Sequence, residues 1–161
     1  MDLIKILRNA FLVVLACLVL SACATKKVSA PAGQMQGDVY TGTDTVEYLA
    51  DGVPDRVFFA TNESILTTRS RDTLRKQAGW LRENSGVTVV LEGHADERGT
   101  REYNLALGER RANAAKDYLM TYGVSSNRIS VISYGKERPV DSGSNPLGWS
   151  KNRRSVTVKA N

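Results

Sequence analysis

The sequence predicts an α+β fold, a two-layer sandwich in which helices cover one face of a mixed β-sheet. From residue 53 onward, short runs rich in β-branched and aromatic residues alternate with longer segments of helical periodicity, in the order βαβα followed by two strands. The length of 161 residues allows one ordinary domain and some additional tail. The 13 glycines, 4 prolines and 2 cysteines exclude a collagen and a disulfide scaffold.

The first strand and the first helix lie between residues 57 and 83. The apolar run at 57–59 is a short strand. A threonine at 67 or 68 can cap the helix, in which Leu74, Ala78 and Leu81 recur at i, i+4 and i+7 and therefore face the core. The opposite face is basic and carries Arg69, Arg71, Arg75, Lys76 and Arg82.

The remaining elements follow in a regular order. Residues 87–92 form a β-branched strand, a polar loop covers 94–101, and a long helix spans 102–122 before Gly123 as its C-cap. We expect the core stripe of this helix to be Tyr103, Leu107, Ala114 and Tyr118. A third strand at 128–134, a short turn at 149–152 and a last strand at 155–159 complete the sheet.

The N-terminus has the organisation of an export signal. Lys5 and Arg8 precede an uncharged apolar run at 10–20, which is shorter than the roughly 20 residues that span a bilayer. The sequence Leu-Ser-Ala-Cys at 20–23 resembles a bacterial lipobox. We therefore predict a lipoprotein signal peptide over residues 1–22 and lipidation of Cys23; the alternative is an ordinary secretory signal with an incidental cysteine.

Residues 23–50 are predicted to form the lipidated cysteine and a flexible tether, and residues 51–161 the folded domain. The tether is polar, with few large apolar side chains, and about 27 such residues extend to roughly 90 Å. A short strand at about 45–49 is the alternative for its last part. The chain has a net charge of +5 and a pI of about 9.4, but export makes nucleic acid an improbable partner. Ala24, after Cys23, is not the aspartate that retains many lipoproteins at the inner membrane, which favours the outer membrane.

Four motifs carry a resemblance to a known family. They are GHADERGT at 93–100, YNLALGERRA at 103–112, SYG at 133–135 and NRR at 152–154. In this order and spacing they resemble the OmpA-like peptidoglycan-binding domain, over roughly residues 55–159. With the lipobox and the tether, the chain is similar to the lipid-anchored, peptidoglycan-associated members of that family.

The residues of these motifs also suggest a ligand on chemical grounds. Asn104, Gly108 and Arg111 are spaced i, i+4 and i+7 and share one helical face, near Asp96 at the end of a strand. An arginine matches a carboxylate and an aspartate matches an ammonium, so the pair suits a zwitterionic amino-acid group. The alternative for Asp96 and Arg111 is a surface ion pair without a ligand.

The resemblance assigns roles to these residues. It implies that Arg111 holds the carboxylate of diaminopimelate in the peptidoglycan stem peptide and Asp96 holds its ammonium, supported by Arg98 and Asn104. Backbone N–H groups of Thr61 and Asn62 would add contacts. Asn62 departs from the family pattern, in which an aspartate usually stands, so only a backbone contact survives there.

The sequence argues against an enzyme. Asp96, Glu97 and His94 lie close together, but neighbours on one exposed loop do not make the carboxylate-flanked groove of a glycosidase. The sequence has no serine nucleophile elbow, it has only one histidine, and lipidation would leave no free thiol. We therefore expect no catalysis, no bound metal and no cofactor.

The resemblance implies a non-enzymatic tether between the outer membrane and the cell wall. Its implied partners are peptidoglycan, outer-membrane lipid through acylated Cys23, and the Tol system, chiefly TolB, with a role in envelope constriction at cell division. The alternative is a periplasmic protein–protein adaptor that uses the basic face of the first helix and does not bind peptidoglycan directly.

Overall fold

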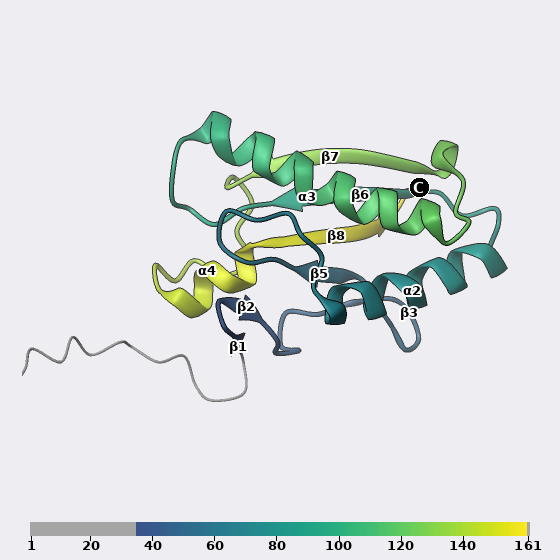
Figure 1. Cartoon of the computed structure of the whole chain (residues 1–161), viewed down its shortest axis with the longest axis horizontal. Coiled ribbons are helices and arrows are strands. Elements are labelled where there is room, and N and C mark those ends of the chain that lie inside the picture. Colours follow the sequence, from purple (N-terminus) through teal and green to yellow (C-terminus); the bar gives the residue numbers. More distant parts are fainter. Residues whose placement is uncertain (1–34, 161) are drawn as a thin grey trace, which may run out of the picture.

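The computed structural model of the chain describes residues 35–160 (Figure 1), so the predicted signal peptide and Cys23 lie outside the described residues. In chain order the elements are β1 (Met35–Gln36), β2 (Val39–Tyr40), β3 (Tyr48–Ala50), β4 (Val53–Pro54), β5 (Arg56–Phe58), α2 (Thr68–Glu83), β6 (Val89–His94), α3 (Arg101–Thr121), a 3₁₀ turn (Ser126–Arg128), β7 (Ile129–Gly135), α4 (Pro146–Asn152) and β8 (Arg154–Lys159).

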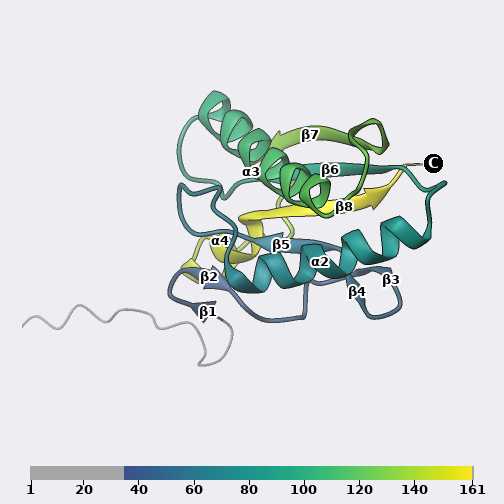
Figure 2. The same ribbon diagram turned by 45° about the vertical axis from the view of Figure 1, so that its right-hand side comes forward.

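The main sheet has four strands in the order β5-β8-β6-β7. The last strand of the chain, β8, is inserted between β5 and β6 and is antiparallel to both, while β6 and β7 are parallel and joined through α3. Helices α2 and α3 lie on the same face of this sheet in both ribbon views (Figures 1 and 2). The predicted α+β class, with helices on one face of a mixed sheet, is confirmed.

The phase of α2 follows the prediction and that of α3 does not. Leu74, Ala78 and Leu81 of α2 are buried. In α3 the predicted stripe is wrong at Tyr103, which is 43% exposed, whereas Leu107 is buried and Tyr118 is partly buried against the core. The residues that α3 buries are Asn104, Leu107, Gly108, Arg111, Ala112, Ala115 and Leu119. The buried face of α3 therefore includes two polar side chains, Asn104 and Arg111, so hydrophobic periodicity alone does not identify this face.

Side-chain caps set where the helices begin. The Thr67 hydroxyl accepts from the Ser70 N–H at 3.1 Å at the start of α2, and the Thr100 hydroxyl accepts from the Tyr103 N–H at 3.2 Å at the start of α3. Asn145 caps α4 in the same way, and a proline occupies the first turn of that helix. Helix α4 thus begins three residues before the predicted turn at 149–152.

Residues 35–50, predicted as part of the tether, pack against the domain. They form the β1–β2 hairpin and strand β3, and they bury Tyr40 and Leu49. The Tyr40 ring meets the Phe58 ring edge-on, with centroids 4.8 Å apart. Two isolated large apolar side chains extend an existing core although their surroundings in the sequence are polar, which composition alone does not reveal.

Two glycines bring α3 against the central strand β6. A Cβ atom built on Gly93 of β6 would fall inside the carbonyl group of Gly108 in α3. Because the neighbour is backbone, no side-chain rotation can make room for it. This close approach sets the distance between the helix that carries Arg111 and the strand that leads to Asp96.

We predict that Gly93→Ala lowers the free energy of unfolding by about 1–3 kcal/mol or more, because the helix must move away from the sheet. The matched control is Gly79→Ala in α2, where an added Cβ meets nothing within 4 Å. That variant should gain about 0.5–1 kcal/mol from helix propensity. Urea denaturation measures both; equal effects would contradict the close approach.

Candidate functional site

The candidate site lies at one end of the sheet, where the loops after β5 and β6 meet α4 (Figure 1). The loop after β6 begins with Ala95, whose N–H donates to the Gly135 carbonyl at 2.8 Å and keeps the loop beside β7. Asp96 follows and is buried. Its position results from the end of a central strand, where the chain leaves the sheet.

The Asp96 carboxylate is held by two arginines. Oδ1 accepts from the backbone N–H and Nε of Arg98 at 3.2 and 3.0 Å, and Oδ2 accepts from Arg98 Nη2 at 2.6 Å and Arg153 Nη1 at 3.2 Å. Burial alone would raise the pKa of Asp96, but hydrogen bonds from Arg98 and Arg153 outweigh it and hold the pKa below 3.8. Asp96 is therefore ionised at neutral pH.

Arg153 is a site residue that the sequence prediction left out. It lies between α4 and β8, is buried, and donates from Nε to the Phe59 carbonyl at 3.1 Å in addition to its bond to Asp96. Its Nη2 also donates to the backbone carbonyl of Asp38. The NRR motif at 152–154 was the available signal, but its spacing did not show that Arg153 and Asp96 are in contact.

Arg111 is fully buried, and its guanidinium binds backbone. Nε donates to the Glu63 carbonyl at 2.8 Å, Nη1 to the His94 carbonyl at 2.8 Å and Nη2 to the Ala60 carbonyl at 3.0 Å. Burial and the charge of Arg153 lower the pKa of Arg111 to about 10, so it remains charged at neutral pH. Arg111 thus joins the loop after β5 to the end of β6.

Arg98 and Asn104 order the loop between β6 and α3. The buried Asn104 amide donates from Nδ2 to the Arg98 carbonyl at 2.8 Å. The Arg98 side chain is 41% exposed, with its guanidinium carbon 4.3 Å from the centroid of the Trp149 ring. The Trp149 indole in turn donates to Glu97 Oε1 at 2.8 Å, so this tryptophan lies at the rim of the site.

Thr61 and Asn62 form the loop on the other side. The Thr61 hydroxyl accepts from Arg98 Nη2 at 3.4 Å, and its backbone N–H donates to Asp38 Oδ2 at 2.6 Å. Asn62 is exposed and has a φ of 57°, a left-handed conformation that asparagine tolerates better than most residues. Of the predicted residues, Asp96, Arg98, Asn104 and Thr61 are linked by hydrogen bonds, and Arg111 reaches them through backbone.

The site is rich in positive charge. Three guanidiniums, of Arg98, Arg111 and Arg153, surround one buried carboxylate, Asp96. This arrangement suits an anionic group of a ligand. Within residues 35–160, no cluster of His, Cys, Asp and Glu is arranged to hold a metal ion. Over the same range, no helix has the length and apolar character needed to cross a membrane.

Comparison with known proteins agrees with this fold and identifies a family. The OmpA family matches residues 58–153. A peptidoglycan-associated lipoprotein of Mesorhizobium japonicum is 44% identical over 94% of this chain and 92% of its own length, and one of Pasteurella multocida is 38% identical over 94% and 97%.

Solved structures give the same result. The peptidoglycan-associated lipoprotein of Burkholderia pseudomallei has a TM-score of 0.64 at 34% identity, covering 66% of this chain and 90% of that chain. The C-terminal domain of Helicobacter pylori MotB shares the fold alone, with a TM-score of 0.62 at 20% identity over 66% and 84% of the two chains. The chain therefore belongs to the OmpA family, in its peptidoglycan-associated lipoprotein branch, a class of binding proteins and not of enzymes.

His94, the last residue of β6, is buried beside the site. Neither of its ring nitrogens makes a hydrogen bond within residues 35–160, but Nε2 lies 3.5 Å from Oε2 of Glu92. Burial, followed by the charges of Arg154, Arg56 and Arg138, lowers its pKa to about 3. Because the unfolded chain binds this proton near pH 6.5 and the folded chain does not, folding loses stability as the pH falls from about 6.5 toward 3.

We predict that His94→Phe flattens the fall in the free energy of unfolding between pH 6.5 and 4.5, since Phe cannot bind a proton. Urea denaturation across that range measures it. Asp96 contributes little to this slope, because the lowered pKa of its carboxyl means that most of its stabilisation is lost below about pH 4, outside the measured range. An unchanged slope in the variant would show that His94 is not the titrating group.

Proposed function

We propose that the domain binds peptidoglycan non-covalently by holding the zwitterionic side-chain end of meso-diaminopimelate in the stem peptide. The observation that supports this most directly is the group of buried Arg111 and Arg153 and half-exposed Arg98 around the buried Asp96. A free carboxylate in the ligand would supply the negative charge that the cluster lacks, and its ammonium would bind Asp96.

The hydrogen bonds of Asp96 indicate how the ammonium enters. Four bonds already occupy the carboxylate, three from Arg98 and one from Arg153. Arg98 is the more exposed of the two and rests on Trp149, so its side chain can move aside while Arg153 stays. Arg111 and the backbone of residues 60–63 would then face the ligand carboxylate.

Anchoring at the membrane completes the proposal. Acylation of Cys23 would hold the chain in the outer membrane, with the domain facing the periplasm and the peptidoglycan. The lipobox and the similarity to peptidoglycan-associated lipoproteins over 94% of the chain support this arrangement. Partnership with TolB and the Tol–Pal system, and a role in envelope integrity and constriction at division, rest on the family resemblance alone.

We predict that the full chain, purified in mild detergent, co-sediments with diaminopimelate-type sacculi and not with lysine-type sacculi, whose stem peptide lacks the second carboxylate. Asp96→Asn should weaken binding by tenfold or more, roughly the 1.5–3 kcal/mol of a charged hydrogen-bond pair. The matched control is Asp117→Asn on the exposed face of α3, which removes the same charge away from the site.

Thermal melting of each variant checks that it is folded. Sedimentation that is unchanged in folded Asp96→Asn would remove Asp96 from the site. The basic face of α2 provides a second comparison, because charge reversal at Arg71 and Arg75 should leave sacculus binding intact. If the wild type itself stays in solution with both kinds of sacculi, the adaptor function is favoured, and charge reversal at Arg71 and Arg75 should then abolish binding of its protein partner.

A further inference from the structure

The β1–β2 hairpin inserts a carboxylate of the chain itself into the candidate site. Gly37 and Asp38 form the two-residue turn between the paired strands, and Gly37 has a φ of 65°. From this turn, Asp38 Oδ2 accepts from the Thr61 N–H at 2.6 Å and lies 3.9 Å from Arg153 Nη2. The same guanidinium donates to the Asp38 backbone carbonyl.

Asp38 therefore makes the contacts that a ligand carboxylate would seek. It takes a backbone N–H of the loop after β5 and faces the cationic cluster. Burial alone would raise the pKa of Asp38, but the Thr61 hydrogen bonds and the Arg153 charge outweigh it and lower the pKa. The charge of Asp38 also acts on Arg98, the residue whose movement the proposed ligand requires.

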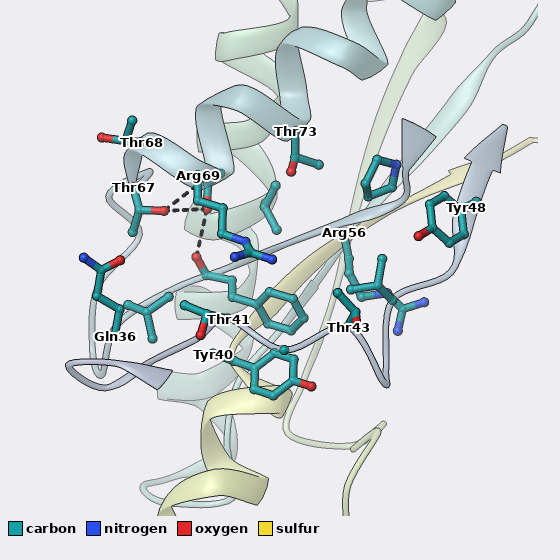
Figure 3. Close-up of a pocket in the computed structure, with 17 residues that line it drawn as sticks. Gln36, Tyr40, Thr41, Thr43, Tyr48, Arg56, Thr67, Thr68, Arg69 and Thr73 are labelled. Atoms are coloured by element: carbon teal, nitrogen blue, oxygen red, sulfur yellow. Dashed lines mark hydrogen bonds between the residues drawn. The ribbon is translucent and has the colours of Figure 1, made fainter. Parts of the chain in front are cut away.

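The turn of the β1–β2 hairpin is positioned so that it can move away from the site and pack there again. The Asp38 side chain is 48% exposed, and the turn is bonded to the site through the Thr61 N–H and the Arg153 guanidinium. A hollow of about 430 Å³ separates the segment that includes Gln36 and Thr41 from β5 and the start of α2 (Figure 3). Tyr40, packed on Phe58, anchors the base of the hairpin, so the turn can lift without unfolding the segment.

We propose that Asp38 is an internal competitor for the carboxylate position of this site, which the ligand carboxylate displaces when it binds. The inference rests on the proposed function and adds regulation to it. Since the hairpin lies within the predicted tether of residues 23–50, lifting its turn would return those residues to the tether. Binding to the wall and the reach of the anchor would then be coupled.

The test compares affinity for a stem tripeptide ending in meso-diaminopimelate, measured by calorimetry on the full chain in mild detergent. Asp38→Asn keeps an oxygen acceptor but removes the charge, and we expect it to bind roughly three- to tenfold more tightly, the factor of one charge-assisted hydrogen bond. Asp51→Asn, in the exposed turn after β3, removes the same charge elsewhere and should bind like the wild type.

Amide hydrogen exchange gives a second readout. In the wild type, exchange by residues 35–40 should rise when the tripeptide saturates the protein. Equal affinities of Asp38→Asn and the wild type, or weaker binding by Asp38→Asn, would overturn the competition while leaving the proposed function in place. If neither the wild type nor Asp38→Asn binds the tripeptide, both the competition and the proposed function are overturned.

Discussion

The site depends on the buried guanidinium of Arg111. It joins three parts of the chain that are distant in sequence, because it extends from α3 to carbonyls of the loop after β5 and of the last residue of β6. Burying a charge is costly unless its donors are satisfied. Here neutral carbonyls satisfy three of the five N–H donors, and no carboxylate within residues 35–160 forms an ion pair with this guanidinium. The surroundings of Arg111 consequently favour an anion.

The site includes residues from the C-terminal part of the chain, because the last strand lies in the middle of the sheet. Strand β8 enters between β5 and β6, and Arg153 immediately before it bonds to Phe59 and Asp96 together. The contact of Gly93 with Gly108 brings α3 close enough for Arg111 to reach the strand ends. The same glycine contact thus packs α3 on the sheet and sets the geometry of the site. A change at this contact should therefore alter the site as well as the free energy of unfolding.

Local signals in the sequence predicted much of this fold. The threonine cap of α2, the stripe of Leu74, Ala78 and Leu81, and the glycine-ended strands act over a few residues and could be predicted directly. The buried face of α3 could not be predicted in this way, because Arg111 and Asn104 are buried through their hydrogen bonds to backbone carbonyls, and hydrophobic periodicity does not detect such residues. The packing of Tyr40 and the contact of Arg153 with Asp96 depend on segments brought together only by tertiary structure.

The excess of positive charge at the site also explains why the turn of the β1–β2 hairpin packs there. Arg98, Arg111 and Arg153 exceed the charge of Asp96, and the turn at Asp38 supplies a carboxylate without an external ligand. The affinity of the domain for any carboxylate is then a difference between two interactions, one with the ligand and one with Asp38. If a ligand carboxylate takes the same donors, as proposed, the internal carboxylate lowers its apparent affinity without changing any contact that the ligand makes.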